Sequence, residues 1–121
     1  MVKKKILVVD DEPDIREFLK KRLEKNNFNV ITATNGKECL QLASREDPDL
    51  ILLDIVMPVM DGYETIKNLR SNPRTKNITI LMHSVRKETK SIFKSMELGS
   101  IDYVIKPVSF EKLLTVIKRY V

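Results

Sequence analysis

Carboxylates directly follow two short apolar runs of this 121-residue chain. Asp10 and Asp11 come after Ile6–Val9, and Asp54 comes after Leu50–Leu53. Three carboxylates held close together repel one another unless a cation or a hydrogen-bond donor neutralises them. Carboxylates, backbone carbonyls and waters are also the ligands that a hard ion such as Mg²⁺ prefers. These three residues are therefore a candidate magnesium site, provided that the fold brings the two segments together.

A hydroxyl and an ammonium group follow two later apolar segments. Ser84 comes at the end of "ILMHS", and Lys106 comes at the end of "YVIK". A carboxylate nucleophile, a metal site, a hydroxyl and a cation are the groups that phosphoryl transfer to a carboxylate requires, because this reaction depends on positioning and charge neutralisation. A single surface lysine or loop serine would be ordinary. The prediction of this chemistry therefore depends on all four segments ending at one place.

Short apolar runs alternate along the chain with stretches of helical spacing, which predicts alternating strands and helices. In the first helical stretch, for example, Ile15, Phe18 and Leu19 lie on one face. The predicted strands are Ile6–Val9, Val30–Thr34, Leu50–Leu53, Ile78–Met82 and Tyr103–Ile105. Signals for helix starts are Pro13, Asn35 with Glu38, Asp61 with Glu64, and Ser109. Gly99 signals the end of a helix.

Strict alternation of strands and helices predicts a parallel sheet with helices on both faces. The first, third and fourth strands are apolar throughout and should be central, whereas the second and fifth contain polar residues and should be edges. With right-handed crossovers the strand order, numbered along the chain, is 2-1-3-4-5, and the first and last helices share one face of the sheet. The predicted fold is a doubly wound, flavodoxin-like α/β domain over residues 1–121, with its ligand site where the first and third strands end.

The composition is that of a globular protein, with 42% hydrophobic and 32% charged residues. Lysine and arginine number 22 against 17 acidic residues, but they are scattered over every predicted helix, so we expect a solvated surface rather than nucleic-acid binding. No segment has the length and apolar character of a membrane span. The single cysteine, Cys39, excludes an intramolecular disulfide and is consistent with the reducing cytoplasm. We expect it to be a core residue of a helix.

Four segments, in this order and spacing, resemble the receiver domain of two-component response regulators: "ILVVDDEPD", "DLILLDIVMPVMDGYE", "HS" and "DYVIKP". The resemblance covers essentially the whole chain. It implies that Asp54 accepts a phosphoryl group from a histidine of a sensor kinase or phosphotransfer protein, or from a small phosphodonor. It also implies that the domain is not an enzyme for external substrates and catalyses only its own Mg²⁺-dependent phosphorylation and dephosphorylation.

The resemblance implies roles for the residues around Asp54. Asp11 and Asp54 would coordinate Mg²⁺ directly, together with the backbone carbonyl of Val56, whereas Asp10 would act mainly through water. Lys106 would pair with Asp54 and then with the phosphoryl group.

The resemblance also implies a switch. Ser84 would move to hydrogen-bond a phosphoryl oxygen, Tyr103 would be the aromatic switch residue, and the peptide bond between Lys106 and Pro107 would be cis. Tyr103 and Lys106 are an odd number of positions apart, so their side chains should leave opposite faces of the last strand. The lysine would then face the site, and the tyrosine would face the helix that ends at Gly99.

Three residues occupy positions that vary in this family or depart from its pattern. Val85 stands where the family usually has a small residue, and its branched side chain is expected to narrow access to the phosphoryl group. Val56 and Arg86 occupy positions that tune the phosphoryl lifetime. Because Val56 cannot orient an attacking water by hydrogen bonding, we expect slow self-dephosphorylation.

His83 is the only histidine and neighbours Ser84, which raises the idea of a phosphohistidine. Adjacent strand residues point to opposite faces of a sheet. We therefore expect His83 to pack beneath a helix instead.

Two other functions stay open at this point. An aspartyl-phosphate hydrolase would usually carry a D-x-D pair after its first strand and an inserted cap domain, and this chain has neither. The second alternative is a protein-interaction module with the receiver fold that is never phosphorylated. The three carboxylates and Lys106 argue against it, whereas the unusual Val85 is compatible with it. Nucleotide binding is disfavoured because neither common glycine-rich phosphate motif occurs.

The surface for a downstream protein or output domain is expected on the last two helices and the last strand. The first of these helices combines Phe93 with several basic residues, although a solvated helix face explains the lysines equally well. The chain is either a stand-alone receiver that acts through protein contacts, including a phosphorylation-dependent homodimer, or part of a longer regulator. The basic residues are Arg86, Lys87, Lys90 and Lys94.

Overall fold

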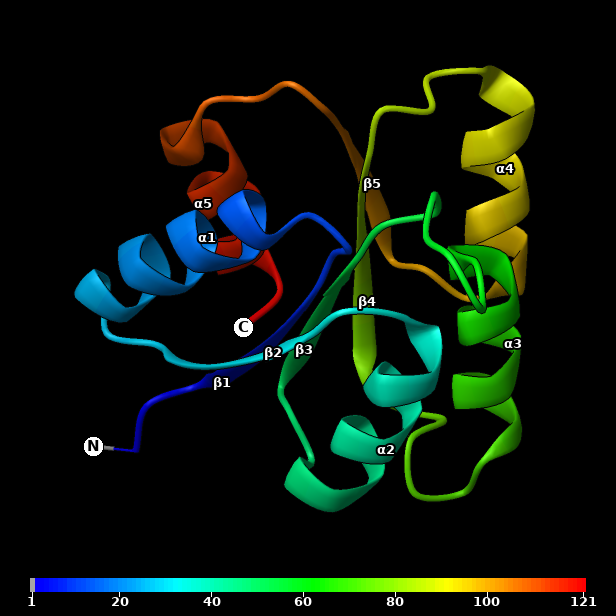
Figure 1. Ribbon diagram of the computed structural model, residues 1–121, viewed down its shortest axis with the longest axis horizontal. Helices are drawn as coiled ribbons and strands as arrows, with labels where there is room; N and C mark the ends of the chain where they lie inside the picture. The colour runs from blue at the N-terminus through cyan, green and yellow to red at the C-terminus, as the bar shows by residue number, and fades with distance from the viewer. Residues whose placement is uncertain (1) are drawn as a thin grey trace.

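Strands and helices alternate along residues 2–121, the part of the chain that the computed structural model describes (Figure 1). The bounds of the strands are β1 Lys5–Val9, β2 Asn29–Ala33, β3 Leu50–Leu53, β4 Thr79–Ser84 and β5 Asp102–Ile105. The bounds of the helices are α1 Pro13–Lys25, α2 Gly36–Glu46, α3 Gly62–Ser71, α4 Thr89–Leu98 and α5 Phe110–Arg119. All the elements expected from the apolar spacing are therefore present. The strand bounds differ from the predicted ones by one or two residues: β1 begins at Lys5, β2 lies one residue earlier, β4 begins after Ile78 and continues to Ser84, and β5 begins at Asp102.

The five strands described in residues 2–121 form one parallel sheet in the order β2-β1-β3-β4-β5, as predicted. Strands β1 and β3 are direct neighbours, with Val9 opposite Leu53. The next pairs place Leu53 opposite Met82 and Ser84 opposite Ile105. This register brings the carboxyl ends of β1, β3, β4 and β5 to one edge of the sheet.

Helices cover both faces of the sheet, with α1 and α5 on one face and α2, α3 and α4 on the other (Figure 1). Two hydrophobic clusters fill the spaces between the layers, and alternate residues of each central strand contribute to each cluster. Cys39 is fully buried in the cluster beneath α2 and α3, so its predicted place in a helix core is confirmed. Within residues 2–121, none of the helices combines the length and the apolar character that crossing a bilayer requires.

Side-chain caps begin three of the helices at the predicted positions. The side chains of Asn35, Asp61 and Ser109 accept hydrogen bonds from backbone N–H groups in the first turns of α2, α3 and α5. Pro13 occupies the first turn of α1, and Gly99 ends α4 with a φ of 127°. These local signals fix where each helix starts relative to the strand end before it.

Candidate functional site

Three carboxylates converge at the carboxyl edge of the sheet. Asp10, Asp11 and Asp54 each place an oxygen within 4.8 Å of the others. The side chains of Asp10 and Asp54 are almost fully buried, whereas Asp11 is exposed. Oxygen donors at this spacing suit a hard divalent cation that keeps some of its waters.

The sheet register explains why residues from two distant segments meet. The backbone N–H of Asp54 donates to the carbonyl of Val9 at 3.2 Å, which continues the β1–β3 pairing by one residue. The N–H of Asp10 donates to the carbonyl of Ala33 on the other side, also at 3.2 Å. Asp10 and Asp54 are thus fixed by the ends of central strands rather than by a mobile loop.

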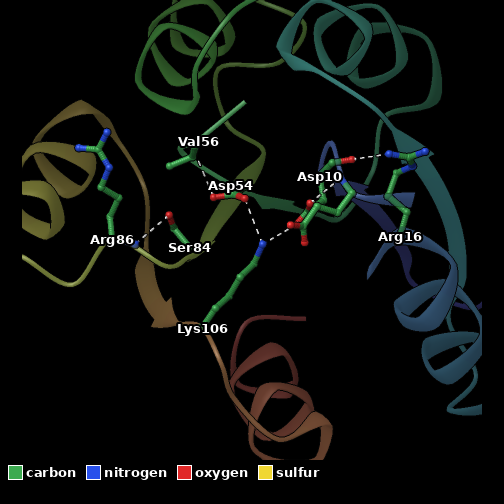
Figure 2. A network of polar contacts seen from close by, with 8 residues as sticks. Asp10, Arg16, Asp54, Val56, Ser84, Arg86 and Lys106 are labelled. Atoms are coloured by element: carbon green, nitrogen blue, oxygen red, sulfur yellow. Dashed lines mark hydrogen bonds and ion pairs between the residues drawn. The ribbon is translucent and has the colours of Figure 1, made fainter. Parts of the chain in front are cut away.

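Lys106 connects two of these carboxylates (Figure 2). Its Nζ donates to Oδ2 of Asp10 at 2.6 Å and to Oδ2 of Asp54 at 3.0 Å, and the lysine side chain is only 10% exposed. Burial alone lowers the pKa of the ammonium, but the hydrogen bonds and charges of Asp10 and Asp54 outweigh it and raise the pKa above its usual value. Lys106 is therefore a fixed cation, and it partly neutralises the acidic cluster.

Backbone groups occupy the other carboxylate oxygens. Oδ1 of Asp54 accepts from the N–H of Val56 at 3.2 Å, and Oδ1 of Asp10 accepts from the N–H of Glu12 at 3.0 Å. Arg16 also reaches the site, because its Nη1 donates to the backbone carbonyl of Asp10 at 2.7 Å (Figure 2). The sequence offers no signal for this role, since an arginine in the first turns of a helix is usually solvated.

Ser84 and Tyr103 both bind the loop between β4 and α4. The Oγ of Ser84 is buried and accepts a hydrogen bond from the N–H of Arg86 at 3.3 Å. The hydroxyl of Tyr103 donates to the carbonyl of the same Arg86 at 2.5 Å. The ring of Tyr103 packs on the cluster that faces α2, α3 and α4, whereas Lys106 reaches the acidic cluster. The peptide bond between Lys106 and Pro107 is cis.

His83 is buried on the opposite face of β4 from this loop. It is 7% exposed and lines a cavity of about 490 Å³ between α1 and α5. Burial, and then the charge of Lys106, lower the pKa of its imidazole to about 4, against a smaller opposing effect of Asp54. The imidazole is therefore neutral at physiological pH. It lies under the α1–α5 layer, as the alternation of strand residues predicts, but it faces open space rather than closely packed atoms.

Two exposed valines lie beside the acidic cluster. Val56 is 46% exposed and Val85 is 60% exposed, and both line the opening of the cavity beside Asp54. Val59, in the loop between β3 and α3, is 80% exposed and has a left-handed backbone with a φ of 71°. The approach to Asp54 is therefore bordered by apolar side chains.

Comparison with known proteins gives one consistent family. A model described as the response regulator receiver domain matches residues 6–118. The alkaline phosphatase synthesis transcriptional regulatory protein PhoP of Bacillus subtilis (strain 168) is 44% identical over 106 residues, which cover 88% of this chain and 43% of that protein. The probable transcriptional regulator ycf27 of Porphyridium aerugineum is 39% identical over 113 residues, which cover 93% of this chain and 46% of that protein. The chain thus spans less than half the length of these curated relatives.

A solved structure has the same fold over nearly the whole chain. The chemotaxis protein CheY4 of Vibrio cholerae superposes with a TM-score of 0.94 at 31% sequence identity, covering 99% of this chain and 100% of that one. Similarity of sequence and similarity of fold therefore point to the same family.

Proposed function

The chain belongs to the response regulator receiver domain family, and from this membership and the geometry of the site we propose that it accepts a phosphoryl group on Asp54 and thereby changes its contacts with a partner. The observation that carries this proposal is the convergence of four strand ends on one carboxylate. Asp54 has a cation, Lys106, on one oxygen and a backbone N–H on the other, with two further carboxylates beside it.

The proposed reaction transfers a phosphoryl group from a donor to Asp54. A carboxylate oxygen of Asp54 forms a bond to phosphorus, and the bond from phosphorus to the donor breaks, so that its electron pair leaves with the donor. The donor is a phosphohistidine of a sensor kinase or phosphotransfer protein, or a small acyl phosphate. Lys106 and the backbone N–H of Val56 bind the two oxygens of Asp54, so both donors lie next to the position that a phosphoryl group on Asp54 would take.

The acidic cluster fits a magnesium ion by its donor set. Asp11, Asp54 and the backbone carbonyl of Val56 would hold the ion directly, and the chemistry that bound Mg²⁺ supplies is neutralisation of the phosphoryl oxygens. Both oxygens of Asp10 already accept hydrogen bonds, from Glu12 and Lys106. Both oxygens of Asp54 accept hydrogen bonds as well, from Val56 and Lys106, so the less direct role proposed for Asp10, through water, rests on the family resemblance.

The proposed signal leaves the site through the loop between β4 and α4. Ser84 would turn to a phosphoryl oxygen, which releases the N–H of Arg86 that it now binds. Tyr103 donates a hydrogen bond to the carbonyl of the same residue. A movement of Ser84 would therefore displace Arg86 and, through it, Tyr103 and the start of α4. That start lacks a side-chain cap, as does the start of α1, whereas α2, α3 and α5 are capped by side chains.

The proposed partner surface lies on α4, β5 and α5. Phe93 is 62% exposed on α4, and Met96 of α4, Ile101 after it and Ile105 of β5 are also exposed apolar residues. We propose that a downstream protein, an output domain or a second receiver binds here, without direct contact to nucleic acid or membrane. Turnover of an external substrate is not part of the proposal, and a cytoplasmic location stays a prediction.

The lifetime of the phosphoryl group follows from the side chain at position 56. Val56 is partly exposed beside Asp54 and offers no polar atom beyond its backbone. An attacking water therefore gains no orientation from it, and slow self-dephosphorylation is expected. Decay of the isolated phosphoprotein, followed by intact mass, checks this, and a half-life of seconds would contradict it.

A direct test of the acceptor uses acetyl phosphate and Mg²⁺. The unaltered protein should gain the mass of one phosphoryl group, and Asp54→Ala and the closer mimic Asp54→Asn should not. Absence of labelling on the unaltered protein, or undiminished labelling of either variant, would overturn the proposal. The same samples on a sizing column show whether phosphorylation promotes dimers.

A further inference from the structure

The cavity between α1 and α5 is continuous with the acidic cluster, since Asp11, Asp54 and Lys106 also line it. Its volume is about 490 Å³, within the range of small-molecule sites. Its walls are mostly apolar and come from the inner face of α1, the segment after β5 and the first turns of α5. The wall residues used below are Ile15, Phe18, Leu19, Phe110 and Leu113.

His83 is a buried polar residue that lines this cavity together with the charged Asp54 and Lys106. The residue is more than nine-tenths buried, and its imidazole forms no hydrogen bond with residues 2–121. No polar side-chain atom in that range is both fully enclosed and unbonded. The ring nitrogens of His83 must therefore reach the open space of the cavity that the residue lines. An unpaired polar group in an apolar cavity is the usual anchor of a small ligand.

Two aromatic rings form part of the wall. Phe18 and Phe110 meet edge to face, with ring centroids 6.3 Å apart and planes at 87°. The guanidinium of Arg22 lies over both rings, at 5.4 Å and 4.7 Å from their centroids, which holds them in this arrangement. An aromatic ligand can therefore pack its edge or face against these two rings, which are already held in place before it binds.

In the absence of a bound cation, the charges at the mouth disfavour anions. Asp11, Glu12 and Asp54 line the opening, and the nearby cation, Lys106, already binds two carboxylates. A charged group would also lose hydration against the apolar walls. The space therefore suits an uncharged molecule with one hydrogen-bonding group.

We propose that this cavity binds a small neutral aromatic alcohol, with its ring against Phe18 and Phe110 and its hydroxyl on the imidazole of His83. Because His83 is only 7% exposed, a broad protein surface over the mouth would make little contact with it. The neutral imidazole offers one donor and one acceptor, and a phenolic hydroxyl matches either.

The first test uses the unaltered protein and two probes that differ only in the hydroxyl, para-cresol and toluene. Titration by NMR, without metal or phosphodonor, should shift the methyl signals of Ile15, Leu19 and Leu113 and the ring signals of His83. Para-cresol should bind about fivefold more tightly than toluene, the ratio that one neutral hydrogen bond supplies. Equal affinities, or no binding of either probe, would overturn the proposal. Absence of binding would instead favour contact of this cavity with side chains of a protein partner.

The second test uses variants. His83→Phe keeps a ring of similar size and should weaken para-cresol about fivefold while leaving toluene unchanged. The matched control is Leu42→Ala, which removes an apolar side chain that packs on the core at the other face of the sheet. It should leave both affinities unchanged. If His83→Phe binds para-cresol as well as the unaltered protein does, the assigned anchor is wrong. No phosphorylation enters either test, so failure here and failure of the acceptor role at Asp54 are distinguishable.

Discussion

Lys106 and Asp10, 96 residues apart in the chain, form a 2.6 Å ion pair at the carboxyl edge of the sheet. The contact from the same ammonium to Asp54 is longer, at 3.0 Å. The resemblance to receiver domains implies a pair between Lys106 and Asp54, and the structure adds Asp10 as a second partner. Lys106 is thus shared between the proposed acceptor and a second buried carboxylate, so its removal affects both.

Replacement of Lys106 should destabilise the protein most in the absence of divalent cations. Lys106→Met leaves the buried carboxylates of Asp10 and Asp54 without their cation, and breaking such a pair from one side costs about 3 kcal/mol. Urea unfolding in the presence of a chelator measures this loss. Added Mg²⁺ should restore more stability to the variant than to the unaltered protein, because the ion replaces part of the missing charge.

The control for this prediction is Lys118→Met, at an exposed position of α5. It should change the free energy of unfolding by no more than about 0.5 kcal/mol. Equal effects of the two substitutions would show that Lys106 is not neutralising buried charge.

Stability should fall as the solution is acidified, in part because of His83. Burial, and then Lys106, lower the pKa of the folded imidazole to about 4, whereas the unfolded chain has the ordinary value of 6.5. The unfolded state therefore binds a proton first, so this contribution is complete above pH 6.5 and is lost as the pH falls toward 4. The total loss is about 3 kcal/mol.

His83→Phe removes this titration and should flatten the stability curve over the same range. Urea unfolding of both proteins at neutral pH and near pH 4 gives the comparison. An identical pH dependence of the two proteins would contradict the assignment of the effect to His83.

Val59→Gly should stabilise the protein. A β-branched residue at a φ of 71° is strained, and an 80% exposed side chain forfeits little when it is removed. After the extra chain entropy of glycine is subtracted, a gain of about 0.5–1 kcal/mol remains. Val85→Gly, at a comparably exposed valine without a left-handed backbone, should instead destabilise, and thermal unfolding of both variants distinguishes them.

Gly62→Ala should damage both stability and phosphorylation. A Cβ on Gly62 would lie 2.7 Å from the Cα of Ile55 and would overlap the backbone carbonyl of Asp54, and neither group can rotate away. We expect a loss of about 2 kcal/mol in unfolding free energy. Labelling of Asp54 by acetyl phosphate should also slow, since the backbone that carries the acceptor must move.

Thr89→Ala is the matched control for Gly62→Ala, because Thr89 is the exposed first residue of α4 as Gly62 is the first residue of α3. It should leave both the unfolding free energy and the initial labelling rate nearly unchanged. A normal labelling rate in Gly62→Ala would mean that the backbone at Asp54 tolerates the displacement.

The sequence by itself determined the layout of the fold. Helix and strand periods, together with caps such as Asn35 and Asp61, are local properties, and the structure confirms them along the chain. The strand order followed from apolar strands at the centre and right-handed crossovers. The meeting of Asp10, Asp11 and Asp54 was predictable for the same reason, since neighbouring parallel strands end at one edge.

Only the tertiary structure decided which atoms of these residues bind one another. The second partner of Lys106, the reach of Arg16 to the carbonyl of Asp10 and the attachment of Tyr103 to Arg86 depend on side-chain directions across segments far apart in the sequence. The same holds for the cavity in which His83 lies unpaired, because the gap between α1 and α5 is set by how two helices pack on one sheet. Periodicity reports which face a residue occupies, but hydrogen-bond partners require distances of about 3 Å, and only the packed chain defines these.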